Sequence, residues 1–248
     1  MLRLGLCTVI GFEPQTEALA ALQNRKTPFE TYLPDVIGDG EEHFLHVTAA
    51  SGMTSLLEPD VARLALFNGF SDWGRVVDRI RLMTRRLDDI EAIGAIDMLK
   101  LDVQGAEIMV FRGGTQSLER AVVVHTEVSF IGLYKGQPSL GQLDLELRHL
   151  GFIPHALAHL KLWPIAPVVY DHDIRKPMHQ LLEADLVYVR DFTHPEGMSD
   201  EQLKHLAILS HCVYGSSDLT HRCILMMRDR RLIPWNTPEE YLKRAHIR

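Results

Sequence analysis

The chain has 248 residues, 46% hydrophobic and 24% charged, which is ordinary globular composition with material for one α/β domain and a tail. A formal net charge of −7, with Lys and Arg scattered along the chain, argues against nucleic acid as a partner. Three cysteines without CxxC spacing and 13 scattered histidines without an HExxH frame predict free thiols, a reducing compartment and no metal site. The first apolar run meets an acid too soon for a signal peptide or membrane span, so we expect a cytoplasmic protein with no membrane partner.

The first half of the chain alternates short apolar runs with turn residues and helical patterns. Residues 9–12 predict a buried strand, and residues 14–25, which open with a proline, predict a helix. Two apolar stretches separated by "GDGEE" favour strand, turn, strand over residues 27–47. Residues 55–70 have the spacing of a surface helix that starts at a proline, and residues 76–87 alternate like an exposed or edge strand.

The second half carries the strongest strand and helix patterns. An apolar strand ends near Asp102, and the helix after it stops at the glycine pair of "FRGG". Residues 121–130 form a near-continuous apolar run, typical of a strand covered on both faces of a parallel sheet. A helix over residues 140–150 follows, and then short strands near Phe152 and over residues 186–189.

Strands that alternate with helices of this length predict a doubly wound α/β domain over residues 1–193. Beyond it, capping-box patterns at Ser199 and Thr237 mark two helix starts. We therefore expect residues 194–248 to form a C-terminal helical extension.

Acidic residues at strand ends are the first candidates for chemistry, because ligands of open α/β sheets bind beyond the carboxyl ends of the strands. Three acids fit this position: Glu13, Asp102 and Glu127. Glu13 is placed like an acid that accepts hydrogen bonds from ribose hydroxyls, and equally like an acid that complements the dipole of the helix beginning near Pro14.

The other candidates lie near Asp102 and Glu127. Lys100 and Asp102 share a strand face, where they form either a structural ion pair or a site in which Asp102 polarises an acceptor or holds a cofactor. His125 and Glu127 also share a face, and Glu127 could pair with Asp102 or be satisfied by backbone amides. Glu107 falls in the first turn of a helix, where the dipole favours a carboxylate whatever its role.

Four stretches, "VIGFEPQTEALAAL", "RRLDDI", "IDMLKLDVQGAEIMVFRGG" and "HTEVSF", together resemble the FkbM family of S-adenosylmethionine-dependent methyltransferases. That family reads fEP, then LD, then LKiDvEGaE followed by a glycine, and then an acid in the next strand. The combination in this order is specific, although each piece alone is weak. The resemblance covers about residues 8–192 and implies a Rossmann-like class I methyltransferase fold that uses S-adenosylmethionine.

Carried over residue by residue, the resemblance implies cofactor contacts at two places early in the chain. Glu13, with Pro14 beside it in the fEP motif, would bind the ribose, and Gly38 and Asp39 would lie in the loop that borders the adenine.

Later in the chain, Asp102 and Glu107 match the Asp and the last Glu of DvEGaE, which implies that both lie at the cofactor. Gln104 departs from the motif's glutamate and removes one carboxylate. A larger departure lies upstream, where the family has a first strand and a glycine-rich loop but only "MLRLGLC" precedes Thr8, and no GxGxxG or DxGxxxG stretch occurs. We therefore expect the first strand to be missing, because the true start lies upstream or because the protein has lost it.

Methyl transfer from a sulfonium is an in-line displacement, so the protein mainly aligns the acceptor and excludes water. A carboxylate or histidine within hydrogen-bond reach would remove the proton of an acceptor hydroxyl, and Asp102, His125 and Glu127 are the candidate catalytic residues, in that order. We therefore expect O-methylation of a carbohydrate or another small hydroxylated molecule.

Two alternatives stay open beside the methyltransferase. A non-catalytic remnant would act as an interaction module, because a missing strand leaves a sheet edge that invites a partner chain or a second copy. A nicotinamide-dependent oxidoreductase also uses an acid after its second strand, but it needs the same glycine loop and explains "LDVQGAE" less well.

Overall fold

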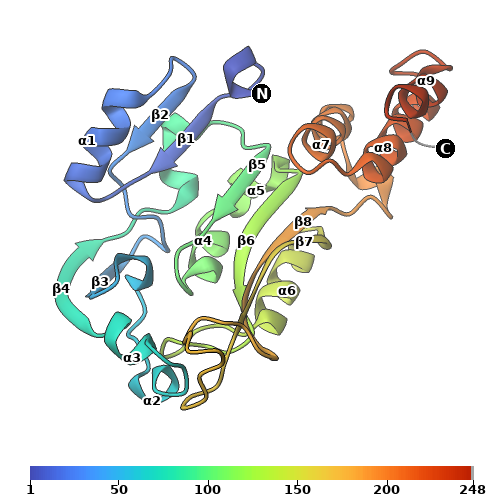
Figure 1. Ribbon diagram of the computed structural model, residues 1–248. Helices are drawn as coiled ribbons and strands as arrows, with labels where there is room; N and C mark the ends of the chain where they lie inside the picture. The colour runs from blue at the N-terminus through green and yellow to red at the C-terminus, as the bar shows by residue number, and fades with distance from the viewer. Residues whose placement is uncertain (247–248) are drawn as a thin grey trace.

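The protein, for which we describe residues 1–246 of a computed structural model, is α/β (Figure 1). Its strands are β1 (Val9–Phe12), β2 (Glu30–Leu33), β3 (Glu42–Thr48), β4 (Val76–Met83), β5 (Met98–Leu101), β6 (Val123–Ser129), β7 (Phe152–Trp163) and β8 (Gln180–Arg190). Its α-helices are α1 (Thr16–Arg25), α2 (Val61–Leu64), α3 (Phe70–Trp73), α4 (Glu107–Gly113), α5 (Thr115–Arg120), α6 (Leu140–His149), α7 (Asp200–Cys212), α8 (Ser217–Asp229) and α9 (Thr237–Arg244). Single 3₁₀ turns lie at Leu2–Leu4, Ser51–Met53, Leu87–Asp89, Glu91–Ile93 and Pro195–Gly197.

Within residues 1–246 the strands form three separate hydrogen-bonded sheets. β1 pairs with β2 in parallel, β3 pairs with β4 antiparallel, and the third sheet has the order β5-β6-β8-β7. In that third sheet β5 and β6 are parallel, whereas β8 is antiparallel to both β6 and β7. Figure 1 shows the β1–β2–α1 unit beside the four-stranded sheet at the upper left, and no ladder joins β1 to β5 within residues 1–246. The α/β class is confirmed, while the Rossmann-like doubly wound arrangement and the missing first strand stay predictions.

The four-stranded sheet is covered on both faces, as the apolar run over residues 121–130 predicted. Because strand residues alternate between faces, Val124 and Val128 face one way and Val123 the other. Val124 and Val128 pack in a core with α4, α5 and α6, whereas Val123 packs in a second core with α7 and α8. The C-terminal helices thus share a core with the sheet, and the division at residue 194 stays a prediction.

Several predicted elements differ in extent. The helix expected over residues 55–70 is two four-residue helices, α2 and α3, because Gly69 takes a left-handed φ of 87° between them. The side chain of Asp60, not the proline before it, caps α2. The two short strands expected near Phe152 and over residues 186–189 are the long antiparallel pair β7 and β8, of 12 and 11 residues.

The two predicted capping boxes have different outcomes. Ser199 accepts from the Gln202 N–H and the Gln202 side chain accepts from the Ser199 N–H, so the first box is confirmed. The second is wrong, because the N-cap of α9 is Asn236 and its side chain makes no capping bond. The strand over residues 9–12 is present but only partly buried, since β1 has a neighbour on one edge and Val9 is 40% exposed.

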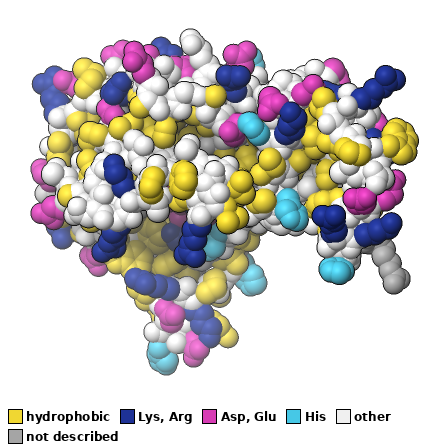
Figure 2. Space-filling view, turned by 90° about the horizontal axis from the view of Figure 1, so that it is seen from above, with side chains coloured by type: hydrophobic (Ala, Val, Ile, Leu, Met, Phe, Trp, Pro, Cys, Tyr) yellow, Lys and Arg dark blue, Asp and Glu magenta, His cyan; other side chains and the backbone are white. Residues whose placement is uncertain are grey.

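No helix within residues 1–246 is both long and apolar enough to cross a membrane. Seen from above, the surface carries many hydrophobic side chains among scattered charges (Figure 2). The exposed hydrophobic residues include Leu4, Leu6 and Val9 near the N-terminus.

Candidate functional site

The carboxyl ends of β5 and β6 bring Asp102 and Glu127 together through the side chain of Gln104. Gln104 Nε2 donates to Asp102 Oδ1 at 2.7 Å and to Glu127 Oε2 at 3.1 Å. The parallel register, with Leu101 beside Thr126, places the residues that follow at the same edge of the sheet. Two of the three acids that the sequence singled out, Asp102 and Glu127, therefore lie in one hydrogen-bonded group with an amide between them, and their catalytic roles stay predictions.

Glu183 and Lys161 extend this group across β8 and β7. Lys161 Nζ donates to Glu183 Oε2 at 2.6 Å, and the Glu183 side chain is buried. Burial first, and then the negative charges of Glu183, Asp102 and Glu107, raise the pKa of Glu127 to about 9, against a smaller lowering by Lys161. In the free protein at neutral pH Glu127 therefore carries a proton.

Glu107 supports the turn between β5 and α4. Its Oε1 accepts from the backbone N–H of Val103 at 3.3 Å and of Gly105 at 3.2 Å. Only 5% of the residue is exposed, and this burial raises the pKa of its carboxyl. These bonds fix the turn that carries Gln104, and the cofactor contact expected of Glu107 stays a prediction.

His125 lies on the same strand as Glu127 but in a different environment. Its Nδ1 is 3.3 Å from the Tyr214 hydroxyl, and its Nε2 is 3.9 Å from Asp185 Oδ2 and has no hydrogen-bond partner in the described chain. Burial, and then the charge of Lys100, lowers the pKa of His125, so the ring is neutral at pH 7. No hydrogen bond within residues 1–246 joins His125 to Gln104, and its role as a base stays a prediction.

Lys100 is exposed and lies beside His125 in the β5–β6 register. No ion pair between Lys100 and Asp102 is formed in the described part of the chain. The predicted structural ion pair between Lys100 and Asp102 is therefore not formed, and the Asp102 side chain is held by Gln104 instead.

Glu13 lies at the carboxyl end of β1, as expected. Its backbone N–H donates to Leu33 O at 2.9 Å, and its Oε1 accepts from the Gln15 N–H at 2.9 Å. This second bond directs the carboxylate to the start of α1, the position where an acid complements the helix dipole. Oε2 has no donor within the described residues, so a ribose contact remains chemically open, and exposed Pro14 makes the turn into α1.

Gly38 and Asp39 form a tightly held loop between β2 and β3. The Gly38 N–H donates to Arg85 O at 2.9 Å, and a methyl group on Gly113 of α4 would collide with the Gly38 carbonyl oxygen. Burial raises the pKa of Asp39, but hydrogen bonds from His43, at 2.8 Å, and from the Glu41 N–H outweigh it, so the pKa is lowered overall. The loop thus presents an ionised carboxylate, and its contact with a cofactor stays a prediction.

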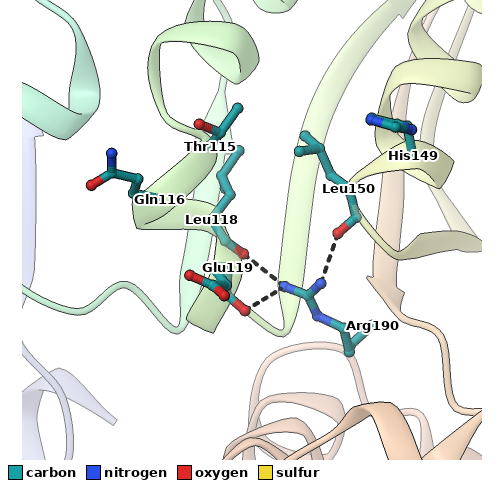
Figure 3. Close-up of a pocket in the computed structure, with 7 residues that line it drawn as sticks. All are labelled: Thr115, Gln116, Leu118, Glu119, His149, Leu150 and Arg190. Carbon is teal, nitrogen blue, oxygen red and sulfur yellow. Dashed lines mark hydrogen bonds between the residues drawn. The ribbon is translucent and has the colours of Figure 1, made fainter.

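The pocket drawn in Figure 3 has a volume of about 360 Å³ and lies at the other end of the strands from Glu127, where β6 begins and β8 ends. Arg190 ends β8 there, where its backbone N–H donates to Val122 O just before β6 begins. Its guanidinium donates to four carbonyl oxygens, those of Leu118, Glu119, Ala121 and Leu150. Arg190 therefore satisfies the carboxyl ends of α5 and α6, and the pocket is structural rather than part of the candidate site.

Several residues of the site were missed by sequence reasoning. The Tyr134 hydroxyl lies 3.2 Å from Gln104 Oε1 and 3.0 Å from Met53 O, and Ser55 Oγ donates to Gln104 O at 2.7 Å. Neither Tyr134 nor Ser55 carries a sequence signal, because both reach Gln104 across long stretches of chain. Glu183 does carry a sequence signal, because it is an acid inside the apolar run "QLLEADLVYV".

Within the described residues, no group of three or more His, Cys, Asp or Glu side chains is arranged to hold a metal ion. The acids of the site are bonded instead to Gln104, Lys161 and backbone amides.

Comparisons with known proteins identify the family. A family model described as the Methyltransferase FkbM domain matches residues 1–154. A protein named 2-O-methyltransferase NoeI, from Sinorhizobium fredii (strain NBRC 101917 / NGR234), is 44% identical over 77 residues, which are 29% of this chain and 32% of that protein. No solved structure matches the chain. The match over more than half of its length shows that the chain belongs to the FkbM family of methyltransferases.

Proposed function

We propose that this protein transfers a methyl group from S-adenosylmethionine to a hydroxyl of a carbohydrate or a related small molecule. The observation that carries the proposal is the Asp102–Gln104–Glu127 group at the carboxyl ends of two parallel strands, the usual position of a ligand in an α/β sheet. The family supports methyl transfer, and the relative named as a 2-O-methyltransferase supports an oxygen acceptor.

The residues present fit this cofactor chemically. Glu13 has an uncommitted carboxylate oxygen that can accept from ribose hydroxyls, and Asp39 offers an ionised carboxylate that can accept from an amine. When bound, S-adenosylmethionine supplies an electrophilic methyl group on a positively charged sulfur. Among the described residues, the acids around Gln104 outnumber the cation that acts on them, Lys161, and this surplus of acids favours a positive charge nearby.

In the proposed reaction, Glu127 takes the proton of the acceptor hydroxyl while the oxygen–methyl bond forms and the sulfur–methyl bond breaks. Glu127 Oε2 is held by Gln104, and within the described residues Oε1 has no donor, so Oε1 is the atom available to the hydroxyl. A positive charge beside Glu127 lowers the pKa of its carboxyl and so favours the ionised form that a base requires. Asp102 orients the acceptor, and His125, whose ring is neutral at pH 7, is the next candidate base.

The experiment that tests the proposal is calorimetric titration with S-adenosylhomocysteine, followed by transfer of a labelled methyl group to a panel of oligosaccharides. We expect a binding free energy of about −8 kcal/mol, in the micromolar range. Glu13→Ala should weaken this binding, and the control Glu17→Ala, on the exposed surface of α1, should leave it unchanged. We expect Glu127→Gln to keep the binding and lose the transfer. Folded protein that gives no heat at high ligand concentration would refute the proposal.

A second candidate function, an interaction module, is favoured by the separation of the sheets. β1 and β5 each have one unpaired edge in the described chain, and unpaired edges are templates for pairing with another strand. The apolar side chains of Leu4, Leu6 and Val9 are exposed at the start of β1 and just before it. A partner strand, or a second copy of this chain, would pair there.

Light scattering after size exclusion separates this candidate from the enzyme. An interaction module should self-associate or associate with a partner strand. We expect Val9→Lys to abolish this association, and the control Val61→Lys, on helix α2, to leave it unchanged. A protein that is monomeric at all concentrations and binds S-adenosylhomocysteine would exclude self-association and favour the enzyme.

A further inference from the structure

Gln104 is held in a backbone conformation that few residues other than glycine adopt. Its φ is 52°, and Gly105 after it has a φ of 99°. A left-handed conformation is unfavourable for a residue with a side chain, and such strain collects at functional sites. Ser55 Oγ, which donates to the Gln104 carbonyl oxygen at 2.7 Å, and the Glu107 carboxylate, which accepts from the Gly105 N–H, hold the turn in place.

The side chain of Gln104 uses both ends of its amide. The nitrogen donates to Asp102 and Glu127, and the oxygen lies 3.2 Å from the Tyr134 hydroxyl, which can donate to it. The opposite orientation would place the amide oxygen 2.7 Å from the Asp102 carboxylate, to which an oxygen cannot donate, so the contact with Asp102 fixes the orientation. A glutamate here would set a third carboxylate against the same two, which explains why glutamine fits this particular site.

We propose that Gln104 is a positioning residue for the methyl transfer proposed above: its amide holds the carboxylates of Asp102 and Glu127 in a fixed relation and leaves Glu127 Oε1 to meet the acceptor hydroxyl. The positioning role rests on the proposed function, but the amide bridge between Asp102 and Glu127 can be tested without any methyl transfer. A neutral donor to two acids stabilises the ionised form of each without adding a charge of its own.

The groups that face Glu127 come from every neighbouring element. Asp102 follows β5, Glu107 begins α4, Glu183 lies on β8, and Lys161 lies on β7. Asp185 is opposite Glu127 in the β6–β8 register. Four of these five groups are acids, so the Gln104 amide is the one neutral donor to the Glu127 carboxylate within the described residues. Its removal leaves that carboxylate harder to ionise.

The test is a pH titration of the carboxyl carbons of ¹³C-glutamate-labelled protein, with Glu127→Gln used to assign the Glu127 signal. Gln104→Met removes the amide at nearly the same length, and Gln116→Met, on the exposed surface of α5, is the matched control. We expect Gln104→Met to raise the Glu127 midpoint by about one pH unit and the control to leave it in place. Where Gln104→Met does not fold, Gln104→Glu, which keeps an acceptor for Tyr134, replaces it and raises the midpoint as well.

The same variants give a functional readout. In Gln104→Met we expect the pH profile of kcat to move to higher pH by the same amount as the Glu127 midpoint. At a fixed pH below both midpoints this shift lowers kcat about tenfold. KM for the methyl donor should stay within about twofold of the wild-type value. A Glu127 midpoint that is unchanged in a folded Gln104 variant overturns the inference. A midpoint that moves in protein that transfers no methyl group supports the amide bridge and refutes the proposed function instead.

Discussion

Replacing Glu127 by glutamine should stabilise the free protein, by an amount that grows with pH. The carboxyl has a pKa of about 9 in the folded protein against 4.5 without its surroundings, chiefly because it is buried among other acids. A group whose pKa is raised on folding favours the folded state fully below its unfolded pKa, and this contribution is lost as pH rises towards the folded pKa. The window here runs from about pH 4.5 to about pH 9.

The magnitude follows from the conversion of about 1.4 kcal/mol for each pH unit inside that window. Between pH 5.5 and pH 8 the cost of keeping Glu127 protonated grows by about 3 kcal/mol. Glutamine cannot ionise, accepts from Gln104 Nε2 through its own oxygen, and can donate to Glu183, so it removes this cost without losing the bonds of the site. In a chain of this length we expect the gap in Tm between the two proteins to widen by about 6–12 °C over that range.

Thermal unfolding of wild-type protein, Glu127→Gln and the exposed control Glu91→Gln, across that pH range, measures the effect. The comparison cancels the titration of histidines and other groups that the variants share. A gap between wild type and Glu127→Gln that is constant with pH would refute the reasoning, since it would mean that Glu127 ionises in the folded protein as it does in the unfolded chain.

Two further substitutions test other parts of the fold. Arg190→Met should cost about 3 kcal/mol of unfolding free energy, measured by urea denaturation, because it strips a donor from part-buried carbonyl groups such as those of Leu118 and Leu150. Arg81→Met, on exposed β4, should be neutral, and a cost of Arg190→Met below about 1 kcal/mol would contradict the structural role. Gly113→Ala should push α4 away from the Gly38 carbonyl and weaken S-adenosylhomocysteine binding at least about tenfold in calorimetry, whereas the control Gly197→Ala, whose new methyl group meets open space, should not. Equal binding by the two variants would show that the loop at Gly38 does not depend on this contact.

The candidate site was partly predictable because acids at strand ends have a local signal. Asp102 follows an apolar strand and Glu127 lies inside another, and both positions can be recognised from the local pattern. The parallel pairing of β5 with β6 that brings the two acids together is a property of the folded chain. Glu183 meets them only through the antiparallel pairing of β8 with β6, and Tyr134 only through a loop. Sequence periodicity reports which face a residue takes, but it does not report which strand lies next to it.

Sequence by itself determined the α/β class, the order of most elements, the helix start at Ser199 and the family, because these depend on local periodicity, capping chemistry and motif order. Only the tertiary structure decided that the strands divide into three sheets and that the C-terminal helices share a core with β6 and β8. It also decided that Gln104, which looked like the loss of a charge, is the bridge between Asp102 and Glu127. The physical reason is that hydrogen bonds between distant segments, and the crowding of like charges that raises a pKa, exist only once the chain has folded.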